Sequence, residues 1–362
     1  MTTEQYPYWL CLKTAPDLPL KTCLELLEIY PDPQDFVGIA QHPLYQSGLL
    51  KATTADHLKH AVLPENMPQI KQLILHHEIQ CLSFKEYPPR LREIFAPPLL
   101  LYYRGKLEPA VSQKCLAVVG TRKTSTYGRE MCRKLIAPLC AQGVTIISGL
   151  ALGIDTVAHT TAVNKQGSTI AVLAGGLDNI YPAQNLELSR KITDKGALIS
   201  EYEPATKPDR WNFPARNRLI SALSEVVFIV EGPLSSGAML TAKNAMEQNR
   251  EVCALPGNIN HPNAEGPNHL IKNGAALISK PEDLMYLLGI DSENAVQLEI
   301  NTILSENEQL IYDLIKSEQS KISFDEILLK TKFPIGRLST TLTNLELKGL
   351  IAKESGNCFI SL

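Results

Sequence analysis

The sequence lacks any pair of cysteines in the spacing CxxC, although the chain has 8 cysteines among its 362 residues. Paired cysteines of that kind bind zinc or form redox-active disulfides, so the sequence offers neither type of site. Most of the cysteines lie singly in apolar runs, which is typical of small core residues in a reducing compartment. We therefore expect buried thiols in a cytoplasmic protein.

Long apolar runs and a strong net charge are also missing. No window of about 18 uninterrupted apolar residues occurs, and the N-terminal residues do not join a basic region to an apolar stretch, so we expect no membrane association. The net charge of −3 gives the whole protein no field that attracts nucleic acid. Any nucleic-acid binding must come from a local basic patch.

The common catalytic motifs are absent as well. The sequence contains no GxxxxGK[ST], GxSxG or HExxH, and GTRKTSTYG stands where a dinucleotide fingerprint GxGxxG would follow the first predicted strand. The histidines at 159, 261 and 269 are separated, and turn or capping roles explain Asp155 and Asp178. We therefore expect no metal site, no cofactor and no catalytic set.

What the sequence does contain is a regular alternation of apolar runs and helical stretches after Cys115. Apolar runs without alternation predict strands that are buried on both faces, as in a parallel sheet covered by helices. The predicted fold is therefore α/β, a Rossmann-like doubly wound parallel sheet over about 69–290. The predicted strands are 116–119, 144–147, 169–173, 197–199, 226–230 and 252–255, and the helices are 129–142, 155–166, 183–195, 214–223 and 238–248.

Smaller units are predicted on both sides of this domain. Residues 1–68 have helical spacing broken by prolines and resemble a SAM or helix-hairpin-helix domain, which could serve as an interaction module or bind DNA. Residues 69–112 hold a short strand at 81–84 and an apolar segment at 99–103, and they read as an extension of the central domain. A polar linker is predicted at 291–301.

Residues 302–362 have the pattern of a winged-helix domain. A helix at 307–317, a capping box formed by Ser323 and Glu326, a helical stripe ended at Gly349 and a hairpin around 355–357 make up this pattern. The last helix would enter the major groove of a bound duplex. Since its only basic residues are Arg337 and Lys348, a protein-interaction role ranks ahead of duplex binding.

Four glycine-bearing turns follow predicted strands, where the ligands of open parallel sheets bind. They are 120–122, 148–153, 174–176 and 232–237. Glycine lets the backbone approach a ligand closely, and the amides of a helix start attract an anion. A single turn of this type is commonly only a tight turn, whereas four at one sheet edge indicate anion binding.

The segment Lys207–Arg218, with the sequence KPDRWNFPARNR, carries four basic side chains, one acidic side chain and the aromatics Trp211 and Phe213. Cations hold phosphates, and aromatic faces stack on bases of any identity, so the composition favours single-stranded nucleic acid. A surface loop before a helix is the plain alternative. We expect Arg210 and Phe213 to contact the ligand, and Trp211 and part of 216–218 mainly to hold the loop in place.

Taken together, these motifs resemble the DNA-processing protein A family, also called DprA or Smf. The resemblance covers nearly the whole central domain, in order, and is specific as a set. The matching pieces are AVVGTR at 117–122, SGLALGID at 148–155, AVLAGGLD at 171–178 followed by YP at 181–182, GALISEYEP at 196–204, FPARNR at 213–218, SGAMLTA at 236–242 and ALPGNI at 254–259.

The resemblance implies a non-catalytic protein that binds single-stranded DNA. Members protect incoming DNA during natural transformation (competence), help to load the RecA recombinase in DNA recombination, and form homodimers. It also implies a phosphate contact at Arg122, phosphate-binding amides in the 148–153 loop, and at least one structural residue among 216–218. The expected DNA-binding residues are Gly120, Thr121, Arg122, Lys123, Ser148, Gly149, Gly153, Gly175, Gly176, Arg210, Phe213, Arg216, Asn217, Arg218, Ser236 and Gly237.

The chain departs from the family pattern at two positions. Leu152 stands where the family commonly has arginine, so one cationic contact is missing and Lys123 could supply another. The turn 174–176 has alanine and two glycines in place of GTG. An alternative reading is an enzyme, a nucleotide phosphoribohydrolase of the Rossmann-like type. Its PGGxGT signature is not seen in EGPLSSGAMLT at 231–241.

Overall fold

The computed structural model describes residues 1–76, 79–290, 305–317, 321–347, 350–354 and 357–361. The predicted linker at 291–301, the predicted helix end at Gly349 and most of the turn at 355–357 lie outside the described residues. The chain divides into two compact units, Met1–Ser292 and Glu293–Leu362.

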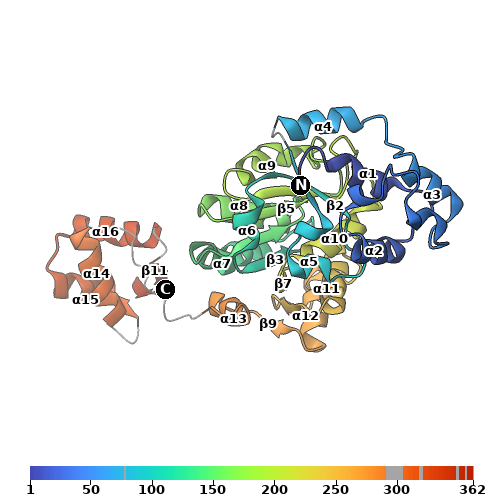
Figure 1. Cartoon of the computed structure of the whole chain (residues 1–362). Coiled ribbons are helices and arrows are strands. Elements are labelled where there is room, and N and C mark those ends of the chain that lie inside the picture. The colour runs from blue at the N-terminus through green and yellow to red at the C-terminus, as the bar shows by residue number, and fades with distance from the viewer. Residues whose placement is uncertain (77–78, 291–304, 318–320, 348–349, 355–356, 362) are drawn as a thin grey trace. The chain divides into compact units, whose positions relative to one another are not determined.

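A nine-stranded sheet forms the centre of the first unit, in the order β1-β2-β6-β5-β4-β3-β7-β8-β9 (Figure 1). Strand β2 is antiparallel to both its neighbours, and the strands from β6 to β9 are parallel. The strands are β1 Gln80–Ser83, β2 Leu100–Gly105, β3 Cys115–Val119, β4 Thr145–Ser148, β5 Thr169–Val172, β6 Ala197–Ser200, β7 Val226–Ile229, β8 Glu251–Ala254 and β9 Ala276–Leu277.

Every residue of β3, β4, β5, β6 and β7 is buried. Helices cover both faces of these strands, so their apolar side chains point into core on either side. The predicted Rossmann-like doubly wound α/β fold is therefore confirmed. Strand β9 at the edge was not predicted, because two residues are too short for a pattern.

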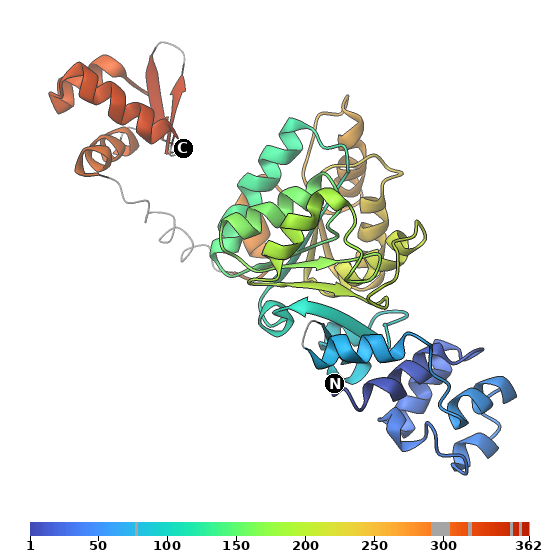
Figure 2. The same ribbon diagram turned by 90° about the horizontal axis from the view of Figure 1, so that it is seen from above.

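The helices of the first unit lie in two layers. α7 and α8 pack together on one face of the sheet, and α10 and α11 pack together on the other (Figures 1 and 2). The helices after the first strands are α5 Pro89–Arg92, α6 Leu107–Val111, α7 Thr126–Ala141, α8 Ile154–Asn164, α9 Leu186–Ile192, α10 Asn212–Ala222, α11 Gly237–Glu247, α12 Glu265–Lys272 and α13 Pro281–Leu287.

The order of the strands creates a switch point between β3 and β7. The chain runs outward from β3 through β4, β5 and β6 on one side, and then continues from β7 on the other. The loops after β3 and β7 therefore diverge and leave a crevice at the carboxyl ends of these strands. Two of the four predicted glycine turns, 120–122 and 232–237, lie at this point.

Four helices precede the sheet and share a hydrophobic core with it. Tyr6 and Trp9 belong to the same buried cluster as Tyr102 of β2 and Leu198 of β6, and the hydroxyls of Tyr6 and Tyr102 lie 3.0 Å apart. The last of these helices begins at Met67, so the domain boundary predicted at residue 68 falls inside it. The helix tolerates Pro68 because this residue lies in the first turn. The helices are α1 Tyr6–Thr14, α2 Leu20–Ile29, α3 Ala52–Lys59 and α4 Met67–Leu75.

The second unit has the predicted winged-helix pattern. Ser323 and Glu326 form the expected capping box at the start of α15, and Ile311, Leu338 and Phe359 belong to its separate core. The three antiparallel strands follow the order β10-β12-β11. Its elements are α14 Glu306–Ser317, β10 Ile322–Ser323, α15 Phe324–Thr331, α16 Ile335–Leu347, β11 Ile351–Glu354 and β12 Cys358–Ser361.

The composition predicts buried cysteines and no membrane association. All of the cysteine side chains except that of Cys358 are buried, as their apolar surroundings predict. No helix within the described residues has the length and apolar character needed to cross a membrane.

Candidate nucleic-acid interface

A cleft of about 380 Å³ lies at the switch point of the sheet. We call it the edge cleft. Its walls come from the turn after β3, the first turns of α10 and the first turn of α11, which the chain separates widely and the parallel sheet brings together. The predicted site residues that line it are Gly120, Thr121, Arg122, Phe213, Arg216, Asn217, Ser236 and Gly237.

Arg122 and Phe213 form the exposed wall of the edge cleft. The Arg122 guanidinium carbon lies 5.1 Å from the centroid of the Phe213 ring, and the ring of Tyr181 packs edge-on against Phe213 at 5.8 Å. Arg122 is exposed, and no carboxylate among the described residues forms an ion pair with it. This wall therefore offers a positive charge beside an aromatic face.

Gly153 fixes the position of the turn that carries Arg122. Its φ is +85°, and a Cβ there would lie 2.2 Å from the carbonyl oxygen of Thr121. Only glycine combines this backbone conformation with so close an approach. Gly153 thus supports the site from behind, and it does not line the edge cleft.

The start of α11 forms the opposite wall. Ser236 is the residue before the first turn of this helix, and its side chain caps no amide. Its hydroxyl is buried and has no hydrogen-bond partner within the described chain. The positive end of an 11-residue helix therefore faces the edge cleft.

Arg216 lies at the base of the edge cleft and is buried, with 4% of its surface exposed. It donates to the carbonyl of Gly149 at 2.8 Å and to that of Val172, and its Nε donates to Asn217 at 3.1 Å. Burial lowers the pKa of Arg216 to about 10, opposed by the charge of Asp155. These contacts hold the loops after β4 and β5, as expected for at least one residue of 216–218.

Asp155 corrects the interpretation of the 148–153 loop. Its carboxylate accepts from the amides of Gly149 at 3.2 Å and Ala151 at 3.3 Å, while burial raises its pKa and the charge of Arg216 opposes that rise. The hydroxyl of Ser148 donates to Val118 at 2.7 Å. These two amides and the Ser148 hydroxyl are therefore used inside the protein and do not point to a ligand.

The third glycine turn also faces protein. Gly175 and Gly176 are buried, and the amide of Gly176 donates to the carbonyl of Thr206 at 2.8 Å. The two glycines allow the 203–208 loop to pack closely over β5, and they do not line the edge cleft.

The other basic residues of the predicted site divide by exposure. Arg218 pairs with Glu201, and both side chains are largely buried. Lys123 is exposed outside the edge cleft. Arg210 is exposed too, with its guanidinium carbon 4.8 Å from the ring centroid of Trp211. Trp211 was expected to hold the loop in place, but 71% of its surface is exposed, so this expectation is wrong.

Two aromatic residues at this surface were missed as site residues. Trp211 lies within the basic segment, where an aromatic next to arginine could have marked it. Tyr181 follows the third glycine turn, and no local pattern indicates that its ring meets that of Phe213. Among the described residues, no cluster of three His, Cys, Asp or Glu side chains could hold a metal ion.

The chain matches two protein-family models. Residues 78–289 match the model described as DNA recombination-mediator protein A, and residues 301–357 match the model described as DprA winged helix domain. Among curated proteins, it is 38% identical to the DNA processing protein DprA of Bacillus subtilis (66% of this chain, 83% of the relative). It is 39% identical to the protein Smf of Escherichia coli (78% of this chain, 76% of the relative).

Solved structures give the same result. DNA processing protein A from Streptococcus pneumoniae superposes with a TM-score of 0.67 at 31% identity, over 79% of this chain and 98% of the other. The protein of the same name from Helicobacter pylori superposes with a TM-score of 0.54 at 32% identity, over 59% of this chain and 96% of the other, and is described by its single-stranded DNA binding mode. The chain belongs to the DNA recombination-mediator protein A family.

Proposed function

We propose that this protein binds single-stranded DNA in the edge cleft, with little preference for base sequence. The observation that carries the proposal is the exposed Arg122 guanidinium beside the Phe213 ring. A cation and an aromatic face side by side match the repeating phosphate and base of an unpaired strand. A duplex hides its base faces, so the aromatic wall would gain nothing from it.

The groups around the edge cleft would bind different parts of a nucleotide. The Arg122 guanidinium and the start of α11 attract a phosphate. The rings of Phe213 and Tyr181 offer a stacking surface for a base. Stacking and phosphate contacts carry little sequence information, so the binding is general.

The exposed pair of Arg210 and Trp211 extends this surface by a second cation and a second ring. Both residues lie just before α10, whose first turn carries Phe213. We propose that a neighbouring nucleotide binds there. The protein then follows the strand with two similar cation–aromatic units.

We propose that the protein binds DNA and does not catalyse a reaction. Asp155 is the carboxylate that lines the edge cleft, and two amides and the nearby charge of Arg216 already engage it inside the protein. It is therefore held as a structural group and is poorly placed to exchange protons with a substrate. Family membership supports the finer proposal of a cytoplasmic homodimer that protects incoming DNA in natural transformation and helps to load RecA.

A titration with single-stranded and double-stranded oligonucleotides at several salt concentrations tests the DNA-binding proposal. We expect tighter single-strand binding and a log–log salt slope of roughly −2, from about −0.7 for each of about three phosphates. Arg122→Ala should weaken binding and flatten the slope by about 0.7. Arg133→Ala is the matched control, since Arg133 is exposed on α7 and does not line the edge cleft.

Equal affinity for duplex, or an unchanged affinity and slope in Arg122→Ala, would contradict the proposal. Equal affinity for duplex would shift the main binding site to the winged-helix unit. Loss of binding in Arg133→Ala as well would mean that general surface charge, and not the edge cleft, holds the strand.

A further inference from the structure

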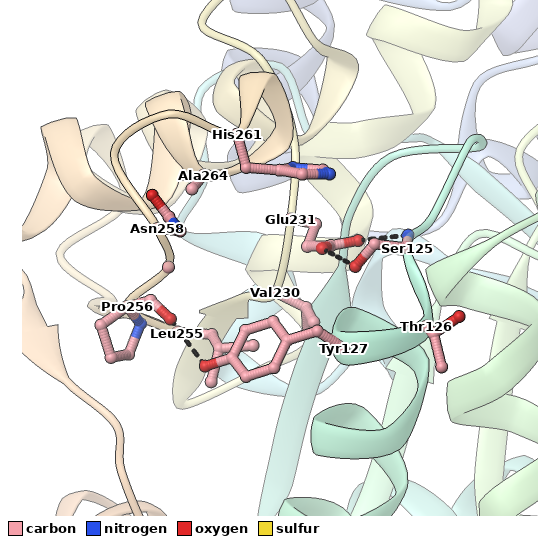
Figure 3. A pocket seen from close by; sticks show the side chains of 11 residues that line it. Ser125, Thr126, Tyr127, Val230, Glu231, Leu255, Pro256, Asn258, His261 and Ala264 are labelled. Atoms are coloured by element: carbon pink, nitrogen blue, oxygen red, sulfur yellow. Dashed lines mark hydrogen bonds between the residues drawn. The ribbon is translucent and has the colours of Figure 1, made fainter.

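A second cavity, of about 640 Å³, opens at the carboxyl ends of β7 and β8 and at the first turn of α7 (Figure 3). We call it the Glu231 pocket. It shares no lining residue with the edge cleft. Its volume is within the range of small-molecule sites, about 300–1,000 Å³. Its lining is formed by Ser125, Thr126, Tyr127, Val230, Glu231, Leu255, Pro256, Gly257, Asn258, His261 and Ala264.

The walls of the Glu231 pocket are mainly apolar, with one aromatic face. Val230, Leu255 and Ala264 are buried around it. The Tyr127 ring is held by its hydroxyl, which donates to the carbonyl of Pro256 at 2.8 Å, and 46% of the Tyr127 surface remains exposed. A fixed and partly exposed ring among aliphatic groups suits a flat, weakly polar ligand.

Glu231 places a buried carboxylate in this apolar setting, with 4% of its surface exposed. It accepts from the Ser125 amide at 2.9 Å, from the Thr124 hydroxyl at 3.0 Å and from the Ser125 hydroxyl. A carboxylate has about four acceptor positions, so these three donors leave one acceptor position for a ligand. The ligand should therefore present an N–H donor.

His261 supplies the complementary group. Its Nδ1 accepts from the amide of Asn263 at 3.2 Å, so the neutral ring carries its proton on Nε2 and can donate there. Figure 3 shows the His261 and Tyr127 side chains on opposite sides of the Glu231 carboxylate. The pocket thus combines an acceptor, a donor and an aromatic face.

None of the residues that line the Glu231 pocket, all of them described, is lysine or arginine. A phosphate would meet a buried carboxylate and no cation there, so the group inside the pocket should not be an anion. The pocket also offers too few ligands for a metal ion, because Glu231 and His261 are the only lining side chains of the kinds that commonly ligate metals.

We propose that the Glu231 pocket binds a purine base that carries an amino group beside a ring nitrogen, as adenine does. The amino group donates to Glu231, the ring nitrogen accepts from His261, and the face of the base packs on Tyr127. The sugar then faces the opening. This chemistry comes from two sources, a free nucleoside or a base of a bound strand.

Adenosine is the probe, because it has no phosphate and does not need the edge cleft. Its binding is measured by isothermal titration and by saturation transfer from the full chain. We expect adenosine to bind, and purine riboside, which lacks only the amino group, to bind about tenfold more weakly. Tyr127→Ala should weaken adenosine binding about tenfold as well. Tyr286→Ala, at an 82% exposed tyrosine of α13, is the control and should change nothing.

Glu231→Gln tests the acceptor directly and should remove the preference for adenosine over purine riboside. Because Glu231 also holds the start of α7, the thermal unfolding of Glu231→Gln is compared with wild type. Tyr127→Ala leaves the hydrogen bonds of Glu231 to Thr124 and Ser125 in place and gives a second test. Absence of adenosine binding at millimolar concentration, equal binding of purine riboside to the wild type, or full binding in Tyr127→Ala would each overturn the proposal.

A saturating single-stranded oligonucleotide then identifies the source of the base. Displacement of adenosine assigns the pocket to a base of the bound strand, and simultaneous binding assigns it to a free nucleoside. Both outcomes support the pocket. A failure of oligonucleotide binding would count against the edge cleft alone, since adenosine is titrated without DNA.

Discussion

Arg210 and Arg216 belong to one basic segment, yet the first side chain is exposed and the second is 4% exposed. Arg210 lies over the ring of Trp211 at the surface, whereas Arg216 donates to two backbone carbonyls below the edge cleft. Phe213 lines the cleft beside Arg122, whereas Arg218 pairs with Glu201 inside the protein. We call 210–213 the exposed half and 216–218 the buried half.

A positively charged residue in this segment is therefore not necessarily a ligand contact. A buried arginine loses its hydration and needs partners within the protein, so its hydrogen bonds are committed to the fold. An exposed arginine without a carboxylate partner keeps its donors for an anion. Substitutions in the buried half should therefore lower stability, and those in the exposed half should lower DNA affinity.

The largest effect is expected from Arg216→Met. It leaves Asp155 buried without its main compensating charge and frees two buried carbonyls. The free energy of unfolding should fall by about 3–5 kcal/mol. Urea unfolding followed by tryptophan fluorescence measures this, because both tryptophans, Trp9 and Trp211, lie in the first unit.

Arg210→Met is the matched control, and its unfolding free energy should stay within about 0.5 kcal/mol of wild type. Similar losses in both variants would remove the distinction between the two halves.

The next largest effect on stability is expected at His159, which is buried near Arg216. Its Nδ1 donates to the Thr169 hydroxyl at 2.7 Å, and Nε2 has no partner among the described residues. Burial lowers the pKa of His159 to about 3. Between pH 6.5 and about 3 the unfolded state binds a proton that the folded state does not, so stability falls as the pH falls.

The expected loss from this group is about 2 kcal/mol between pH 7.5 and pH 5. His159→Asn keeps a donor to Thr169 but cannot bind the proton, so its unfolding free energy should vary less with pH. Urea unfolding at pH 5, 6 and 7.5 measures the difference. Parallel pH profiles for the two proteins would show that His159 does not titrate in this range.

In the exposed half, Phe213→Ala should weaken single-strand binding by about 1–3 kcal/mol, because the base loses its stacking surface. The unfolding free energy should change little. Fluorescence anisotropy with a labelled oligonucleotide measures the affinity. Phe95→Ala, at a phenylalanine that is 96% exposed, is the control for loss of an aromatic group. An unchanged affinity in Phe213→Ala would show that the ring serves packing alone.

The smallest effect is expected from Arg210→Ala. It removes a cation that is exposed and screened by salt, so affinity should fall by a few fold at moderate salt. The log–log salt slope should flatten by about 0.7 for one lost phosphate contact. Lys243→Ala, an exposed cation of α11 outside the edge cleft, is the control. A flatter slope in both variants would mean that the phosphate path is not localised.

The sequence was sufficient to predict the sheet, the helices of the α/β layers and the winged-helix pattern, because each depends on local periodicity. It also located the turn at 120–122 and the basic segment. It could not separate Arg210 from Arg216, since burial depends on the loops after β4 and β5, which are distant in the chain. For the same reason, the sequence does not show that the amides of Gly149 and Ala151 donate to Asp155 and not to a phosphate.

The Glu231 pocket shows the same limit. The sequence placed His261 among separate histidines, and nothing near it in the chain pointed to Glu231 or Tyr127. Only the parallel sheet brings the ends of β7 and β8 to the start of α7. Side chains that act together across a sheet edge leave no spacing that a sequence pattern can detect.

Photo-crosslinking with a single-stranded oligonucleotide that carries 5-iodouracil can show whether the strand lies in the edge cleft, because this base forms bonds with adjacent aromatic side chains on irradiation. Mass spectrometry then identifies the crosslinked residues. We expect crosslinks at Phe213 or Tyr181, with Trp211 as a second position, and their loss at high salt. Crosslinks confined to residues 305–361 would contradict this expectation and place the strand on the winged-helix unit.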